Sequence, residues 1–248
     1  MSDAVYSRAE VLHRVRQPRF VFSHAARILR ETLAWVSPLQ FDATFRRVSR
    51  MTMVSHRRLR SLQETVRYVV AKNISGDIVE CGVARGGSAA VMALALQQLG
   101  VKRRLWLFDT FSGIPQPSNA DPDYEIARNY AGQFGASVDQ IRASFQRLGI
   151  STTEIEFVPG LFQHTLAPSG VSQIALLHTD GDWYESVKTT LESLYDRVSP
   201  GGVIQFDDYG HWLGAHKAID EFIDKRGIKT QLEYIDYSGR RMIKPAQS

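Results

Sequence analysis

Aspartates stand at two places in the sequence where an apolar run ends. Asp180 and Asp182 follow one run, and the adjacent pair Asp207 and Asp208 follows another. Neighbouring strands of a sheet lie about 5 Å apart, so two strand ends can bring such side chains together. Converging carboxylates repel one another unless a cation or protons compensate them. Asp180, Asp207 and Asp208 are therefore predicted to hold one divalent ion, and hard oxygen ligands favour Mg²⁺, with Mn²⁺ or Ca²⁺ as alternatives.

Candidate proton acceptors lie close to these ligands in the sequence. Asp182 could accept the proton of an attacking hydroxyl, but it could equally cap a helix that begins near Tyr184. His178 lies inside an apolar run, so its pattern suits a core residue as well as a direct role. His211 and His216 are further candidate bases.

A glycine-rich segment at 80–88 follows an earlier apolar run. Such glycines let the backbone pass close to a ligand, although a plain tight connection would also contain them. The spacing Gly-x-x-x-Gly-Gly differs from the Gly-x-Gly-x-x-Gly of dinucleotide-binding proteins. Asp109 ends the next apolar run, where it could hold two ribose hydroxyls or cap a helix. Together these features favour a nucleoside ligand, and Cys81 is interpreted as a packing residue.

Strand and helix patterns alternate along most of the chain. Strands are predicted at 78–81, 105–108, 155–158, 174–178 and 203–206, and helices at 56–70, 88–99, 138–148, 184–198 and 215–225. Residues 112–136 form a long loop, and 231–235 and 241–243 form a hairpin. This predicts an α/β fold: a doubly wound, mainly parallel seven-stranded sheet with an antiparallel C-terminal hairpin and an N-terminal helical extension. Ligands bind such sheets outside the carboxyl ends of the strands, where the acidic residues lie.

Composition narrows the class of protein. The 248 residues are 44% hydrophobic and 23% charged, with no apolar run long enough to span a membrane and a single cysteine. Residues 1–70 contain 13 Arg against 5 acidic residues, yet these arginines are dispersed among apolar residues. A dispersed pattern is typical of solvated helix faces. We therefore expect a cytoplasmic protein with neither a nucleic-acid nor a membrane partner.

Five stretches of the sequence together resemble the macrocin, mycinamicin and noviose O-methyltransferases of antibiotic pathways. They are 52–55, 76–88, 107–115, 178–186 and 200–209, and the string Asp-Thr-Phe-Ser-Gly-Ile-Pro at 109–115 is the most distinctive. The resemblance spans about residues 50–225. It implies a class I fold that uses S-adenosylmethionine, a small-molecule acceptor that is a deoxysugar of a glycosylated natural product, and a homodimer or higher homo-oligomer.

The resemblance also implies roles for individual residues. Asp180, Asp207 and Asp208 would bind Mg²⁺, and Asp182 would be the general base on a sugar hydroxyl. The cofactor pocket would contain Thr52, Ser55, Glu80, Cys81, Gly82, Ser88, Asp109 and Ser112. Residues 1–55 would form a helical extension or lid, and residues 56–248 the methyltransferase domain.

Three other functions are alternatives to sugar O-methylation. Catechol-type methyltransferases are more distantly similar: they have a lysine where this chain has Trp183 and an asparagine where it has Asp208. A phenolic acceptor nevertheless remains an alternative. A nicotinamide-dependent oxidoreductase would explain Asp109 but not the strand-end aspartates, and a nucleic-acid-binding module would leave those aspartates unexplained.

Overall fold

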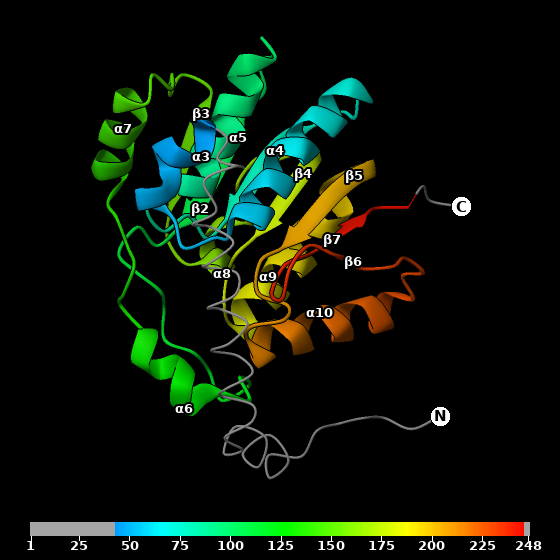
Figure 1. The fold of residues 1–248 in the computed structure, drawn as a ribbon. Helices are drawn as coiled ribbons and strands as arrows, with labels where there is room; N and C mark the ends of the chain where they lie inside the picture. Colours follow the sequence, from blue (N-terminus) through cyan, green and yellow to red (C-terminus); the bar gives the residue numbers. More distant parts are fainter. Residues whose placement is uncertain (1–42, 246–248) are drawn as a thin grey trace.

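The computed structural model describes residues 43–245 and contains a seven-stranded sheet with helices on both faces (Figure 1). The strands lie in the order β3-β2-β1-β4-β5-β7-β6. They are β1 (Asp77–Cys81), β2 (Leu105–Asp109), β3 (Ile155–Pro159), β4 (Ile174–Thr179), β5 (Val198–Phe206), β6 (Glu233–Tyr234) and β7 (Arg240–Ile243). The predicted doubly wound, mainly parallel sheet and its antiparallel C-terminal hairpin are confirmed.

The strand order reverses at the centre of the sheet. Strand β1 pairs in parallel with β2 on one side and with β4 on the other. Strand β5 continues in parallel beyond β4, whereas β7 and β6 run antiparallel. In doubly wound sheets the crevice outside the carboxyl ends at this reversal is where ligands bind. The ligand site is therefore expected among the residues that follow β1, β2, β4 and β5.

The strands are apolar on both faces because both faces are covered. Successive side chains of a strand point to opposite faces, so Ile78 packs with one group of core residues and Val79 with the other. Leu107 and Phe108 of β2 divide in the same way. Near-continuous apolar runs are typical of parallel strands buried on both sides.

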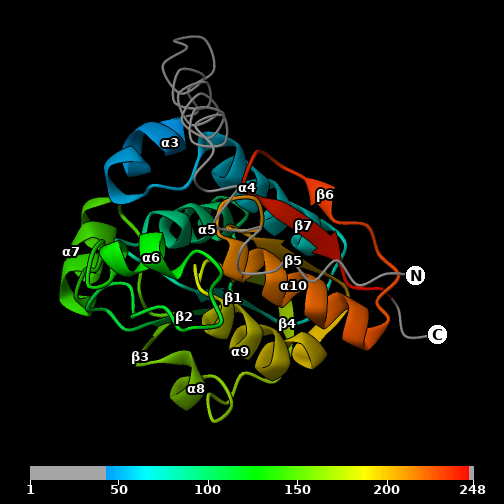
Figure 2. The same cartoon turned by 90° about the horizontal axis from the view of Figure 1, so that it is seen from below.

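Two groups of helices cover the sheet, as the view from below shows (Figure 2). One face carries α3 (Ala43–Val48), α4 (His56–Ala71), α5 (Gly87–Gln98) and α7 (Val138–Arg147), and the other carries α9 (Tyr184–Leu194) and α10 (Leu213–Arg226). In α4 the residues Leu59, Leu62, Val66 and Val69 are fully buried. Their spacing of three and four residues is that of one helix face, as the sequence predicted.

The structure also departs from the sequence-based elements. The predicted loop at 112–136 contains the short helix α6 (Tyr124–Ala127) and the 3-10 helix η2 (Arg128–Tyr130), and a further short helix, α8 (Phe162–Thr165), follows β3. Two more 3-10 helices, η1 (Ser49–Met51) and η3 (Tyr195–Arg197), flank α4 and α9. Helices of four residues carry too little periodicity to be recognised from sequence.

Most of the predicted N-terminal extension lies outside the described residues. The described part, residues 43–55, contains α3 and η1 and ends at Ser55, whose side chain accepts a hydrogen bond from the backbone N–H of Arg58 and caps α4. Within residues 43–245, none of the helices combines the length and the apolar character that crossing a bilayer requires.

Candidate active site

A cleft of about 500 Å³ opens at the carboxyl ends of the central strands. It is lined by residues that follow β1, β2, β4 and β5, by the segment before α4 and by the loop that carries α6. The predicted metal ligands and the predicted base all face this cleft, as do four of the predicted cofactor residues: Thr52, Gly82, Ser88 and Asp109.

The register of β4 and β5 brings the strand-end aspartates together. His178 pairs with Gln205 and Thr179 with Phe206, so Asp180 and Asp207 leave the sheet side by side. The backbone N–H of Asp207 donates to the carbonyl of Thr179 at 3.0 Å, which extends the ladder by one residue. Sheet pairing, rather than any local motif, therefore assembles this acidic cluster.

The carboxylates form two overlapping groups of possible metal ligands. In one group, atoms of His178, Asp180 and Asp207 lie within 4.8 Å of one another; in the other, atoms of Asp180, Asp182 and Asp208 do. Asp207 and Asp208 are buried, while Asp180 and Asp182 are partly exposed to the cleft. Oxygen ligands at this separation suit Mg²⁺ or another hard divalent cation.

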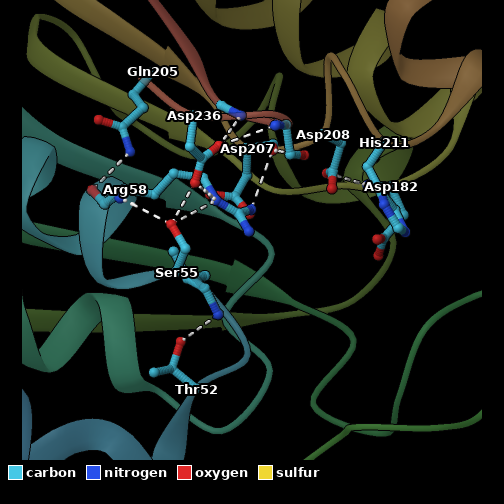
Figure 3. A network of polar contacts seen from close by, with 12 residues as sticks. Thr52, Ser55, Arg58, Asp182, Gln205, Asp207, Asp208, His211 and Asp236 are labelled. Atoms are coloured by element: carbon cyan, nitrogen blue, oxygen red, sulfur yellow. Dashed lines mark hydrogen bonds and ion pairs between the residues drawn. The ribbon is translucent and has the colours of Figure 1, made fainter. Parts of the chain in front are cut away.

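A buried arginine borders the cluster (Figure 3). The guanidinium of Arg58 forms an ion pair with Asp207 and a second with Asp236, in which Nε and Oδ2 are 3.1 Å apart. Ser55 donates its hydroxyl to the same Asp236 oxygen, and Gln205 donates to the carbonyl of Arg58 at 3.2 Å. Helix α4 is thus joined to the ends of β5 and the C-terminal hairpin by charged contacts.

A buried histidine lies behind the cluster. Nδ1 of His178 lies 2.9 Å from Oε1 of Glu80, and Nε2 lies 3.5 Å from Oδ1 of Asp207. Burial alone would lower the pKa of His178, but the neighbouring carboxylates of Asp207 and Glu80 raise that pKa to about 9. The two carboxylates favour the protonated form of His178, which is interpreted as a supporting residue.

The charges of the four aspartates affect one another's pKa values. Burial and the neighbouring carboxylates raise the pKa of Asp180 and of Asp182 well above the ordinary value. Burial and the charge of Asp207 raise the pKa of Asp208 to about 7. Burial also acts to raise the pKa of Asp207, but the charge of Arg58 and the nearby imidazole of His178 keep it below the ordinary value.

The charge balance of the cluster fits a divalent cation. Arg58 is shared with Asp236, and His178 is shared with Glu80, so both groups also face a carboxyl group outside the cluster. Oδ1 of Asp207 is buried and accepts no hydrogen bond from the described residues, although Nε2 of His178 lies beside it at 3.5 Å as an ion-pair neighbour. A buried oxygen that accepts no hydrogen bond and lies beside other carboxylates is a suitable metal ligand.

Asp182 is held in an uncommon backbone conformation. Its φ is +58°, in the left-handed region, which aspartate adopts more readily than most residues. Its N–H donates to Oδ2 of Asp208 at 3.1 Å, and its Oδ1 accepts from Nε1 of Trp212 at 3.0 Å. The alternative role as a helix cap does not apply, because the first N–H of α9, that of Tyr184, donates to Asp121.

The glycine-rich turn after β1 is tied to Asp109. Gly82 has a φ of +95°, and a Cβ there would come within 1.8 Å of the carbonyl oxygen of Asp180. The N–H groups of Val83 and Ala84 donate to Oδ2 of Asp109 at 2.7 and 3.1 Å. Asp109 caps no helix, since residues 110–123 contain none. It fixes the glycine turn and still faces the cleft.

The other four predicted cofactor residues do not line the cleft. Ser55 caps α4, and Glu80 is buried against His178. Cys81 is a fully buried free cysteine whose pKa burial raises, in keeping with a packing role. Ser112 is exposed beside the cleft-lining residue Gly113.

Several residues of the site were not predicted from the sequence. Arg58 stands four residues before the buried Leu62 on the same face of α4, so an arginine on an apolar stripe was the available signal. Asp121 and Asp123 accept from the N–H groups of Tyr184 and Leu213, the first residues of α9 and α10, and no local pattern indicates these contacts.

Comparisons with known proteins agree with one another. A family model described as Macrocin-O-methyltransferase (TylF) matches residues 24–242. An 8-demethyl-8-(2,3-dimethoxy-alpha-L-rhamnosyl)-tetracenomycin-C 4'-O-methyltransferase of Streptomyces olivaceus is 36% identical over 192 residues, which are 76% of this chain and 73% of the relative. The demethyldecarbamoylnovobiocin O-methyltransferase of Streptomyces niveus is 34% identical over 194 residues, with the same coverage. The solved structure of the O-methyltransferase NovP has a TM-score of 0.75 and 32% identity, and the match covers 79% of this chain and 83% of NovP.

Proposed function

Because this chain belongs to the macrocin O-methyltransferase family and is thus an S-adenosylmethionine-dependent O-methyltransferase, we propose that it methylates a hydroxyl of a deoxysugar on a glycosylated natural product. We further propose that Asp180, Asp207 and Asp208 hold one Mg²⁺ and that Asp182 is the general base. The observation that carries the proposal is the convergence of the four aspartates and the glycine turn on one cleft.

The cleft has a cofactor end at the glycine turn and an acceptor end at the aspartates. The turn at Gly82 lets the backbone pass close to the cleft, and Asp109, which holds this turn, also faces the cleft as a carboxylate suited to the ribose hydroxyls of the cofactor. S-adenosylmethionine supplies the electrophilic methyl group on a sulfonium, and Mg²⁺ supplies a positive charge that acidifies a neighbouring hydroxyl. The protein contributes orientation, because the sulfonium already carries a good leaving group.

The reaction is a direct displacement. Asp182 takes the proton of the acceptor hydroxyl, the oxygen forms a bond to the methyl carbon, and the bond between that carbon and sulfur breaks. The products are the methyl ether, S-adenosylhomocysteine and protonated Asp182, which returns its proton to solvent. Asp182 suits this role by its position, because it faces the cleft beside the proposed metal ligands.

The acceptor class rests on the relatives. Two of them are named for a rhamnosyl tetracenomycin and for demethyldecarbamoylnovobiocin as substrates. Aromatic residues that suit the apolar faces of a sugar or its aglycone line the cleft near Asp182: Tyr130, Phe134, Trp183 and Trp212. The chain also has Asp208 where catechol-type enzymes have asparagine, which favours a sugar over a phenolic acceptor.

Methyl transfer to candidate acceptors tests the proposal. The protein is incubated with S-adenosylmethionine, Mg²⁺ and either 8-demethyl-8-(2,3-dimethoxy-alpha-L-rhamnosyl)-tetracenomycin C, demethyldecarbamoylnovobiocin or catechol, and products are read by mass spectrometry. We expect a methylated glycoside whose fragment ions place the methyl on the sugar, and we expect Asp182→Asn to lose most of this activity. Methylation of catechol alone would overturn the sugar assignment, and a fully active Asp182→Asn would overturn the role of the base.

Two further parts of the proposal rest on the resemblance. We propose that the enzyme works in the cytoplasm as a homodimer. Light scattering during size-exclusion chromatography is expected to give twice the monomer mass, and a monomer at all concentrations would contradict the dimer.

A further inference from the structure

Trp212 makes a hydrogen bond that no part of the proposed chemistry has yet used. It stands directly before α10, and its indole Nε1 donates to Oδ1 of Asp182 at 3.0 Å. Trp212 is 8% exposed and lines the same cleft as Asp182. The contact occupies Oδ1 of Asp182, and within residues 43–245 no hydrogen bond to its other carboxylate oxygen is seen.

The indole itself has little freedom to move. Its ring meets Trp183 edge-on at 4.9 Å between centroids, Tyr130 at 5.4 Å and His211 at 4.8 Å. The backbone N–H of Trp212 donates to the carbonyl of Asp208 at 3.0 Å. A donor confined on three sides by other rings keeps its direction, so it can set the rotamer of the carboxylate that it meets.

Asp208, whose carbonyl accepts from Trp212, also holds the backbone of Asp182. The N–H of Asp182 donates to Oδ2 of Asp208, while the carbonyl of Asp208 holds Trp212. Asp208 therefore determines where the backbone of Asp182 lies and where the indole lies. A base placed by two such contacts is pre-organised, and small displacements of a base cost much rate.

We propose that Trp212 is the positioning residue of Asp182, which orients the carboxylate so that its second oxygen faces the acceptor hydroxyl. This inference rests on the proposed role of Asp182 as the base. It assigns a function to a side chain whose hydrogen bond goes to the proposed base itself.

The chain offers a matched control for this hydrogen bond. Nε1 of Trp106 in β2 donates to Oδ2 of Asp77 at 2.9 Å, so it too joins an indole to a carboxylate. Trp106 is 9% exposed, about as buried as Trp212, and it does not line the cleft. Replacing either tryptophan with phenylalanine removes an indole N–H and leaves an aromatic ring.

Nuclear magnetic resonance of the indole N–H groups tests the contact without any acceptor. The resonances of Trp212 and Trp106 are assigned by their loss in Trp212→Phe and Trp106→Phe. We expect Asp182→Asn to shift the Trp212 resonance and to leave that of Trp106 in place, and Asp77→Asn to do the reverse. A Trp212 resonance that does not respond to Asp182→Asn would overturn the inference.

Kinetics then test the positioning role. We expect Trp212→Phe to lower kcat by about tenfold or more, because a hydrogen bond to a charged group is lost, with KM for S-adenosylmethionine changed by less than about twofold. Trp106→Phe should retain wild-type kcat. In the Asp182→Asn background Trp212→Phe should change kcat by less than about twofold, since its effect passes through Asp182.

The outcomes separate this inference from the proposed function. If the wild-type enzyme methylates none of the glycosides, the proposed function fails and the inference fails with it. If Asp182→Asn is impaired but Trp212→Phe behaves like Trp106→Phe, the base remains and the positioning role is overturned. If Trp212→Phe lowers kcat by the same factor in the wild-type and the Asp182→Asn backgrounds, the positioning role is also overturned, because the indole would then act independently of Asp182.

Discussion

Replacing Arg58 with methionine removes a buried guanidinium that lies between two carboxylates. Arg58 is 6% exposed, and its ion pairs with Asp207 and Asp236 are the main charged contacts between α4 and the ends of β5 and the hairpin. Methionine keeps much of the apolar volume of the side chain, so the change tests the charge rather than the packing.

The size of the effect follows from burial. Removing one partner of a buried ion pair leaves the other charge uncompensated and typically costs about 3–5 kcal/mol. For a chain of this size each kcal/mol lowers Tm by about 2–4 °C, so we expect a loss of about 10 °C. Arg60, two residues further along the same helix, pairs with Glu64 but is 60% exposed at its side chain, and exposed pairs contribute about 0–1 kcal/mol.

The assay is urea and thermal unfolding of wild type, Arg58→Met and Arg60→Met, measured in EDTA so that no added cation replaces the lost charge. We expect Arg58→Met to be several kcal/mol less stable and Arg60→Met to match the wild type closely. If the two variants differ by less than about 0.5 kcal/mol, the reasoning about buried charge at this site is wrong.

Three further outcomes follow from the same structure. Gly82→Ala is expected to lower the free energy of unfolding by at least about 2 kcal/mol, through backbone strain and a clash with the carbonyl of Asp180. Gly100→Ala, also at positive φ but with open space around it, should lower it by about 1 kcal/mol. Equal losses in urea unfolding would contradict the close approach at Gly82. The affinity for Mg²⁺, measured calorimetrically, should fall as pH drops below about 7. The reason is that the pKa of Asp208 is raised to about 7, so a proton then competes with the ion. A Kd that does not change between pH values of about 8 and 6 would refute this. Burial raises the pKa of the Cys81 thiol, so a thiol reagent at mildly alkaline pH should label the protein after unfolding and not before, and rapid labelling of the native protein would count against the packing role.

The sequence was most informative where the fold follows from periodicity. Parallel strands end at one edge of the sheet, so the apolar runs that precede Asp180, Asp207 and Asp208 were enough to predict that these side chains converge. The apolar stripe of α4 predicted its length and its buried face for the same reason. Local patterns of this kind determine which elements form and which residues stand at their ends.

The rest of the site depends on contacts between distant parts of the chain. Arg58 meets Asp236 across 178 residues, and the loop residue Asp121 caps α9 across 63. Trp212 and Asp182, separated by 30 residues, meet because β4 and β5 end side by side. Such pairings arise from tertiary packing, which spacing within one segment does not encode.

Calorimetric titration with Mg²⁺ of wild type and Asp180→Asn, each saturated with S-adenosylhomocysteine, tests the central claim most directly. The account predicts that both proteins bind S-adenosylhomocysteine and that the wild type binds one Mg²⁺, with binding to Asp180→Asn at least about tenfold weaker because the shared carboxylate of both ligand groups is gone. Folded wild-type protein that fails to bind S-adenosylhomocysteine, or fails to bind Mg²⁺, would contradict it, as would an Asp180→Asn variant that binds Mg²⁺ as tightly as the wild type.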